Sequence, residues 1–252
     1  MTTEAPPRCA IVTGTTSGIG AEVAAQLLRR GWSVIGMARR PPTVSDVRYE
    51  HLRVDLADAA ALEQVALERV APILRDPKWR RIALVNNAAS PALLGPVQSL
   101  DARALVELYA VNLAAPVWLM GFVSRHCPTT CPLRIVNVSS AAGQHAFPGL
   151  GAYGSAKAGL RMAGMVLAAE WASDVAHAPR RANAAIVSFE PGIVDTEMQN
   201  VARAYSAEQF PWVRMFKDFS AHGRLISPRV PAAEIVSILE SDPTQSFSER
   251  RV

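Results

Sequence analysis

The stretch CAIVTGTTSGIGAEVAAQLLRRG, residues 9–31, decides how the chain begins to fold. Its first residues form a short apolar run with β-branched side chains, which is typical of a buried strand. Three glycines follow, Gly14, Gly18 and Gly20, and the remainder has the periodicity of an amphipathic helix with Gly31 as its C-cap. The stretch therefore predicts a strand, a glycine-rich turn and a helix, in that order.

The spacing of the glycines, G-x-x-x-G-x-G, suggests what the turn binds. Glycines at these points permit a tight turn, close approach of the backbone to a pyrophosphate, and close packing of helix on strand. A purely structural loop would also fit, but the position as the first strand-to-helix turn favours a dinucleotide site. A phosphate-loop NTPase is excluded because no lysine precedes Lys78, and no G-x-S-x-G marks a serine hydrolase.

The rest of the chain continues the alternation of β-branched runs with helical stretches, which indicates parallel βαβ units. The expected strands lie at residues 9–14, 33–38, 49–55, 81–87, 133–140 and 182–190. The expected helices lie at residues 18–30, 58–74, 101–126, 154–172 and 231–240, with Asp101 as an N-cap. We therefore expect an α/β fold: a single Rossmann domain over residues 1–252, with a doubly wound parallel sheet and helices on both faces.

Residues 196–227 differ from the rest, because they carry several aromatic side chains without strand character. We expect either a helical flap that covers the substrate or a plain packed helix.

Composition narrows the function classes. The net charge of +4 is spread along the chain, so nucleic-acid binding is not expected. No apolar run has membrane-spanning length and the start MTTEAPPRCAIVTG lacks a leader pattern, so we expect a soluble, cytoplasmic protein with no membrane partner. Of the three cysteines, Cys127 and Cys131 have only His126 nearby, which predicts reduced thiols and no metal site.

The stretch GLGAYGSAKAGL, residues 149–160, holds the chain's single Tyr-x-x-x-Lys, formed by Tyr153 and Lys157. Residues four apart share one face of a helix, so the phenol and the ammonium can converge. Taken alone, the pair would also fit a surface helix with a snorkelling lysine.

Arg39 and Arg40 follow the second expected strand, where a dinucleotide-binding fold places the carboxylate that binds the adenosine ribose. A carboxylate would repel a 2'-phosphate, whereas an arginine binds it through charge-assisted hydrogen bonds. The two arginines therefore predict NADP(H) rather than NAD(H). The alternative is that both are solvated loop residues.

Together with the glycine turn, five motifs stand in order: NNAAS (86–90), VNLAAP (111–116), IVNVSSAAG (135–143), YGSAK (153–157) and PGIVDT (191–196). With them the chain resembles the short-chain dehydrogenase/reductase family, from about residue 10 to residue 242. The resemblance implies a catalytic set of Asn112, Ser140, Tyr153 and Lys157, of which Tyr153 and Lys157 also contact the cofactor. It further implies that the cofactor is bound by Gly14, Thr15, Thr16, Ser17, Ile19, Asp55, Leu56, Asn87, Ala88, Pro191, Val194 and Thr196, together with Arg39 and Arg40.

The chemistry of the catalytic set fits carbonyl reduction, in which the cofactor carries the hydride and the protein supplies a proton. Tyr153 can donate that proton, and we expect Lys157 to lower the pKa of the phenol toward neutral pH. Ser140 can hydrogen-bond the same carbonyl oxygen. The resemblance implies that Asn112 holds a water that connects Lys157 to solvent.

The C-terminal half, with VDTEMQ and GRLISPRVPAAEIVSILESD, is similar to the sepiapterin reductase and benzil reductase group, which reduces vicinal dicarbonyls with NADPH. We expect a reductase of diketones, ketones or aldehydes. Sepiapterin reduction is the alternative, weakened because the aspartate that binds the pterin in those enzymes has no counterpart after Asp242. A non-catalytic NADPH sensor is a further alternative. His145 and Phe147 either line the substrate pocket or pack the loop.

The family's usual assembly gives an expectation for the quaternary structure. Members commonly pair through helices equivalent to residues 101–126 and 154–172, and the second of these is rich in alanine and methionine here. We expect a homodimer, or a tetramer built from it.

Overall fold

The computed structural model describes residues 6–42, 44–90, 93–173 and 183–252. Within them a seven-stranded, fully parallel sheet has the order β3-β2-β1-β4-β5-β6-β7. The strands are β1 (Arg8–Thr13), β2 (Ser33–Ala38), β3 (Tyr49–Arg53), β4 (Arg81–Asn86), β5 (Leu133–Val138), β6 (Ala184–Glu190) and β7 (Phe247–Arg251). The order reverses between β1 and β4, and such a switch point is where α/β sheets bind ligands, at the carboxyl ends of the strands.

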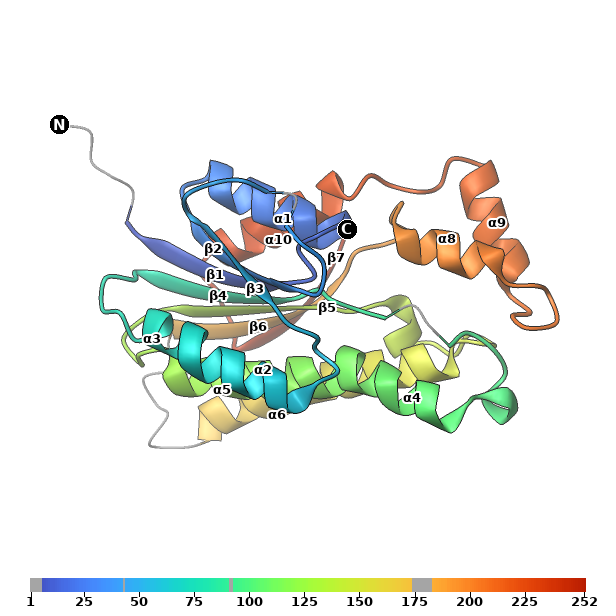
Figure 1. The fold of residues 1–252 in the computed structure, drawn as a ribbon, viewed down its shortest axis with the longest axis horizontal. Helices are drawn as coiled ribbons and strands as arrows, with labels where there is room; N and C mark the ends of the chain where they lie inside the picture. The colour runs from blue at the N-terminus through green and yellow to red at the C-terminus, as the bar shows by residue number, and fades with distance from the viewer. Residues whose placement is uncertain (1–5, 43, 91–92, 174–182) are drawn as a thin grey trace.

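Helices cover both faces of this sheet (Figure 1). On one face lie α1 (Gly18–Arg29) and α10 (Arg229–Glu240). On the other lie α2 (Ala59–Val65) and α3 (Ala71–Leu74), α4 (Ala102–Tyr109) and α5 (Ala115–His126), and α6 (Gly151–Ser173). A π-helical turn joins α2 to α3 (Ala66–Val70), and a second one joins α4 to α5 (Ala110–Ala114). The expected doubly wound, single-domain Rossmann fold is confirmed.

Alternation along the strands explains why they are apolar throughout. In β1, Cys9 and Ile11 belong to the core under α2–α6, while Ala10 and Val12 belong to the core under α1 and α10. A strand that is buried on both faces has no polar side to show, so the continuous hydrophobic runs predict this layered arrangement correctly.

Residues beyond the carboxyl end of β6 form two helices, α8 (Glu197–Ala204) and α9 (Val213–Ala221), which lie past the end of the sheet in Figure 1. They have a small core of their own, which includes the fully buried Phe210. Its ring lies against Gly149, which has a φ of +83°, and a Cβ there would come within 2.6 Å of that ring. The segment is therefore helical, which agrees with the expectation of either a helical flap or a packed helix. It packs against the loop that precedes α6.

The other differences from the expected elements are local. The strand β7 has no counterpart in the sequence prediction, because its segment is polar and only Phe247 packs against the main core. Helix α6 begins at Gly151, three residues earlier than expected. The expected start of the sixth strand at residue 182 lies outside the described residues, and β6 begins at Ala184. Asp101 caps α4 by accepting from the amide of Ala104, as predicted.

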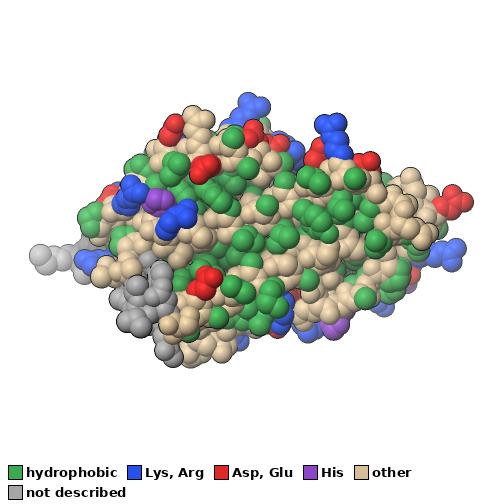
Figure 2. Space-filling model, turned by 90° about the horizontal axis from the view of Figure 1, so that it is seen from below, with side chains coloured by type: hydrophobic (Ala, Val, Ile, Leu, Met, Phe, Trp, Pro, Cys, Tyr) green, Lys and Arg blue, Asp and Glu red, His purple; other side chains and the backbone are tan. Residues whose placement is uncertain are grey.

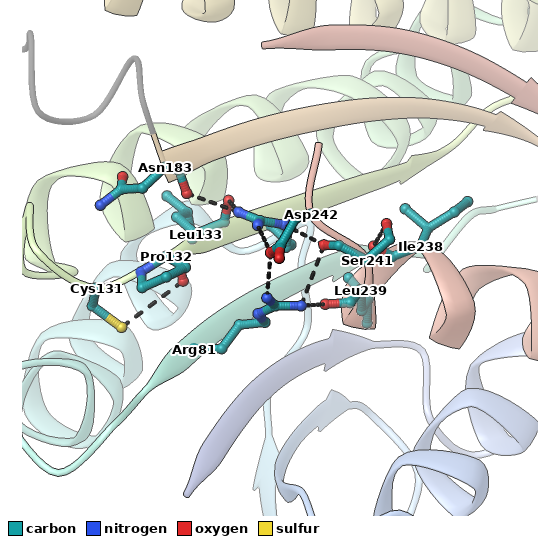
Figure 3. Close-up of polar contacts among 10 residues, drawn as sticks. Arg81, Cys131, Pro132, Leu133, Asn183, Ile238, Leu239, Ser241 and Asp242 are labelled. Carbon is teal, nitrogen blue, oxygen red and sulfur yellow. Dashed lines mark hydrogen bonds and ion pairs between the residues drawn. The ribbon is translucent and has the colours of Figure 1, made fainter. Parts of the chain in front are cut away.

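At the amino ends of the strands, two arginines hold the end of α10 against the sheet (Figure 3). The side chain of Arg81 donates to the carbonyls of Leu239 and Ser241, at 3.0 and 3.2 Å. Arg134, which is buried, donates to Ser241 at 3.1 Å. Both guanidinium groups also contact the carboxylate of Asp242, at 2.7 and 3.1 Å. We call these three charged residues the arginine clasp.

The helical run from Ala102 to His126 is long and apolar enough to cross a membrane, judged by length and composition alone. In this fold, α5 buries the side chains of Leu119, Met120, Phe122 and Val123 in the core between the sheet and helices α2–α6. Packing of a core helix therefore accounts for its apolar character.

Candidate active site

The glycine-rich turn has the geometry of a pyrophosphate cradle. Gly14 and Gly18 adopt left-handed backbone conformations, with φ of +74° and +56°. A Cβ on Gly20 would lie 2.3 Å from the carbonyl oxygen of Gly14, so only glycine lets α1 start this close to β1. The amide of Gly14 donates to Met37 of β2 at 2.8 Å, which fixes the start of the turn. The residues present therefore fit a dinucleotide at this turn.

Thr13, which the sequence prediction missed, ties the turn to the end of β4. Its buried hydroxyl accepts hydrogen bonds from the amides of Asn87 and Ala88, both at 3.0 Å. The side chain of Asn87 in turn donates to the carbonyl of Thr13 at 2.9 Å. A strand-end threonine beside a glycine turn is the signal that could have identified it, once β1 and β4 are known to be neighbours.

The two arginines expected at the 2'-phosphate lie beside the turn. Arg40 donates to the hydroxyl of Ser17 at 2.9 Å. Arg39 lies 3.6 Å from the carboxylate of Asp55, which follows β3 and was expected to flank the adenine. Both guanidinium groups are exposed, so a bound phosphate could reach them, and they concentrate positive charge at the adenosine end of the site.

The loop after β6 reaches back over the turn. A Cβ on Gly18 would lie 3.2 Å from the methyl group of Thr196, so the two segments almost touch. Gly192, with a φ of +76°, turns the chain directly after Pro191. Val194 is buried and forms a β-bridge with Ile226. The residues expected around the nicotinamide thus lie over the glycine turn, at the carboxyl end of the sheet.

Helix α6 carries Tyr153 and Lys157, the pair that the sequence predicts to be catalytic. Lys157 is buried, and its ammonium donates to the carbonyl of Val138 at the end of β5, at 2.7 Å. The same nitrogen lies 5.6 Å from the centre of the Tyr153 ring. A Cβ on Gly154 would lie 2.6 Å from the carbonyl of Ala142, so this glycine lets the loop after Ser140 pack on the helix.

The ionisation of the pair differs from the expectation in one respect. Burial lowers the pKa of Lys157 to about 8. Burial also raises the pKa of Tyr153 to about 12, and a hydrogen bond with Ser140 acts in the opposite direction without outweighing it. The expectation that Lys157 brings the phenol toward neutral pH was therefore wrong for this state of the protein, because desolvation of the hydroxyl dominates.

Asn112 lies in the π-helical turn between α4 and α5 and is fully buried. Its side-chain oxygen accepts from the amide of Ser90 at 2.7 Å, and its side-chain nitrogen donates to the carbonyl of Ser90 at 3.0 Å. The amide group thus holds the loop after β4 in place, and π-helical turns of this kind are frequent at functional sites. The water on Asn112 stays a prediction.

The structure brings the sequence-predicted residues to one end of the sheet. The turn residues Gly14, Thr15, Thr16 and Ser17 stand between β1 and α1, Ile19 lies in the first turn of α1, and Leu56 is buried after β3. Of the two candidates for the pocket wall, Phe147 meets Trp212 of the α8–α9 segment edge to face, with ring centres 5.6 Å apart. His145 is exposed on the same loop.

Comparisons with known proteins point in one direction. The family model described as short chain dehydrogenase matches residues 8–206. A benzil reductase ((S)-benzoin forming) of Bacillus cereus is 31% identical over 243 residues, which cover 93% of this chain and 95% of the relative. A sepiapterin reductase of Meriones unguiculatus is 29% identical, with 94% and 92% of the two chains covered. Among solved structures, the KRED1-Pglu enzyme superposes with a TM-score of 0.78 at 27% identity, over 97% of this chain and 100% of that one.

Proposed function

The chain belongs to the short-chain dehydrogenase family of NAD(P)(H)-dependent oxidoreductases, and from this we propose that it is an NADPH-dependent reductase of diketones, ketones and aldehydes. One observation carries the proposal: Tyr153, with Ser140 hydrogen-bonded to it, lies against the buried ammonium of Lys157 at the carboxyl end of the sheet. A proton donor, a hydrogen-bond donor and a fixed positive charge are what reduction of a carbonyl requires of the protein.

Each member of the set has a separate task in that reaction. A nicotinamide cofactor held at the glycine turn would supply the hydride for the carbonyl carbon. Tyr153 donates its proton to the carbonyl oxygen, and Ser140 hydrogen-bonds that oxygen as negative charge develops on it. Lys157 stabilises the tyrosinate that remains, because its charge lies near the ring and is screened little by water.

The direction of the pKa shift at Tyr153 keeps the phenol protonated at neutral pH. A phenol whose pKa is raised to about 12 stays protonated at neutral pH, which is the form that donates a proton. At neutral pH Tyr153 is therefore in the form that the proposed reduction requires.

The preference for NADPH is supported by charge at the adenosine end. Arg40 is held at Ser17, and Arg39 reaches only an exposed aspartate at 3.6 Å, so both are available to a 2'-phosphate. A phosphate carries more negative charge than the Asp55 carboxylate and accepts bidentate hydrogen bonds from arginine.

The substrate class rests on the relatives. The Bacillus cereus relative and a second one from Bacillus subtilis, also 31% identical, are both named benzil reductases, and benzil is a 1,2-diketone with two aromatic rings. Phe147, on the loop between Ser140 and α6, and Trp212 form an aromatic pair that could pack against the rings of such a substrate. The alternative substrate, sepiapterin, is supported by the similarity to the sepiapterin reductase of Meriones unguiculatus. Asp242 does not provide its pterin-binding carboxylate, because the arginine clasp holds it at the opposite end of the sheet.

An assay that monitors the oxidation of NADPH through the loss of its absorbance tests these assignments. Purified protein is mixed with NADPH or NADH and with benzil, sepiapterin, or simple aldehydes and quinones. We expect turnover of benzil with NADPH at the highest kcat/KM. A higher value with sepiapterin would favour the alternative. Binding of NADPH with no turnover of any carbonyl would favour the non-catalytic sensor and contradict the proposal.

We also propose that the chain forms a homodimer through α4–α6. Figure 2 looks at this helical face of the molecule and shows a broad band of hydrophobic side chains across its middle. Val106 of α4 is 68% exposed, and Met162 and Val166 of α6 are 54% and 48% exposed. Large apolar side chains exposed on adjacent helices are typical of a protein–protein interface. A monomer mass in light scattering at micromolar concentration would contradict this assignment.

A further inference from the structure

A tyrosine on the edge of the sheet reaches the cofactor turn from two strands away. Tyr49 is the first residue of β3, and β2 lies between β3 and β1 (Figure 1). Its hydroxyl nevertheless comes within 2.8 Å of the hydroxyl of Thr15, the residue directly after Gly14 in the turn. The contact crosses β2 and connects an edge strand to the dinucleotide-binding loop.

A glycine in the intervening strand β2 leaves space for the side chain of Tyr49 to cross it. Gly36 of β2 lies under the crossing, and a Cβ there would stand 2.1 Å from the Tyr49 hydroxyl and 2.6 Å from that of Thr15. Any residue other than glycine would therefore push the two hydroxyl groups apart. Gly36 sits in a regular strand with no left-handed backbone, so close approach of the tyrosine is the reason for glycine here.

The hydroxyl of Thr15 is committed to this contact. Thr15 is fully buried, so its side chain points into the protein and away from any cofactor in the cradle. The Tyr49 hydroxyl also lies 3.2 Å from Nδ1 of His51, on the same strand. A chain of three groups results, in which Thr15 can donate to Tyr49 and Tyr49 to a neutral His51.

We propose that Tyr49 is a positioning residue for the cofactor: through the Thr15 side chain it holds the backbone of the glycine turn in the conformation that binds the pyrophosphate. The turn binds through backbone N–H groups, and its glycines leave it few side-chain contacts that restrict it. A fixed side chain at Thr15 reduces the freedom that the loop would lose when a cofactor binds, and preorganisation of this kind raises affinity.

The proposal rests on the family's use of NAD(P)(H), and it makes a prediction distinct from that of the arginines. In the proposed binding mode, Arg39 and Arg40 would contact the 2'-phosphate, which only NADP(H) carries, and so would discriminate NADP(H) from NAD(H). The pyrophosphate is common to both cofactors. Loss of the Tyr49 contact should therefore weaken both by the same factor, and it should leave kcat at saturating cofactor unchanged.

The test is a fluorescence titration of NADPH and NADH into Tyr49→Phe, with no carbonyl substrate present. We expect Kd to rise about fivefold for both cofactors, the effect of one lost hydrogen bond. Thr15→Val should have the same effect, and the double variant should be no weaker than either single one, because both remove the same contact. Thr15→Ser keeps the hydroxyl and should retain the wild-type Kd.

Tyr109→Phe is the matched control, because Tyr109 makes a hydrogen bond of the same length, 2.8 Å, to Ser155 away from the turn. Its Kd for both cofactors should be that of the wild type. A Tyr49→Phe variant that melts earlier but binds both cofactors normally would show a purely structural role and overturn the proposal. Additive effects of Tyr49→Phe and Thr15→Val would also overturn it. If the wild type binds neither cofactor, the family-level function fails instead.

Discussion

The two ends of the parallel sheet treat buried charge in opposite ways. At the amino end, Arg134 is buried with hydrogen bonds from all three of its guanidinium nitrogens, and Asp242 supplies a counter-charge. At the carboxyl end, Lys157 is equally buried and donates to one backbone carbonyl. Its pKa is lowered by burial, and no carboxylate in the described part of the chain offsets that effect. Nearby, the buried hydroxyl of Ser139 has no hydrogen-bond partner within the described part of the chain.

The difference teaches where stability and reactivity are located. Burial lowers the pKa of both Arg134 and Lys157. A buried charge with a full set of partners holds elements together, whereas one with few partners keeps a charge that is not already neutralised. We therefore expect the clasp to serve the fold and the α6 pair to serve the reaction. The variants below test this division, beginning with the largest expected effect.

Removal of the phenol hydroxyl should affect the reaction alone. In Tyr153→Phe we expect kcat for carbonyl reduction to fall about a thousandfold or more, because the proton donor is lost. The Kd for NADPH and the melting temperature should stay close to those of the wild type. Steady-state rates and a binding titration measure the two quantities. Turnover within tenfold of the wild type would rule out Tyr153 as the donor.

Removal of the clasp should affect stability alone. Arg134→Met leaves the carbonyls of Leu133, Asn183 and Ser241 without this donor, so we expect a loss of about 3 kcal/mol in the free energy of unfolding. Urea denaturation measures it, and kcat of the folded variant should not change.

The matched control for the clasp is Arg103→Met on α4. Its pair with Glu107 is exposed on a helix surface, so the free energy of unfolding should be unchanged. An equal loss in both variants would mean that burial of the arginine is not what matters.

Lys157 should oppose stability while it supports catalysis. Its pKa is about 8 in the folded protein and near 10.5 when exposed, so between these values the unfolded chain binds more protons than the native one. Stability from this group therefore rises as pH increases from about 8 to about 10, and its burial is unfavourable below pH 8. We expect Lys157→Met to lower kcat but to gain about 1–2 kcal/mol in stability at pH 7.

Urea denaturation at pH 7 and pH 9.5 checks this expectation. The gain of the variant over the wild type should shrink at the higher pH, where Lys157 is neutral in the native protein. In the wild type, kcat should decrease above pH 8 for the same reason. A variant that is less stable at both pH values would show that the lysine is structurally required.

The smallest expected effect concerns the choice of cofactor. Arg39→Asp places a second carboxylate beside Asp55, so we expect the ratio of kcat/KM for NADPH to that for NADH to fall about tenfold. Arg80→Asp makes the same change of charge just before β4, at the amino end of the sheet, and should leave the ratio unchanged. A ratio that stays at the wild-type value in both variants would place the phosphate contacts elsewhere.

Sequence patterns predicted the layers of the fold because each buried strand is apolar on both faces. They did not predict β7, since a polar edge strand that buries little more than Phe247 carries no hydrophobic pattern. The sequence analysis did not divide residues 196–227 into two helices, although each helix is amphipathic. What the sequence alone does not show is the packing of Phe210 against Gly149, a contact between distant segments.

At the site, motifs identified the reacting groups but not the contacts that depend on strand order. The roles of Thr13 and Tyr49 become visible only when β4 and β2 are known to neighbour β1. The direction of the pKa shift at Tyr153 depends on how deeply its hydroxyl is buried, which no motif records.

The packing of Phe210 against Gly149 also limits how the α8–α9 segment can be redesigned. The aromatic ring anchors the α8–α9 segment to the loop between Ser140 and α6, and the segment's own small core is built around it. An exchange of residues 197–221 between homologues should therefore preserve the fold only where the graft keeps a phenylalanine at its centre and the host keeps its glycine.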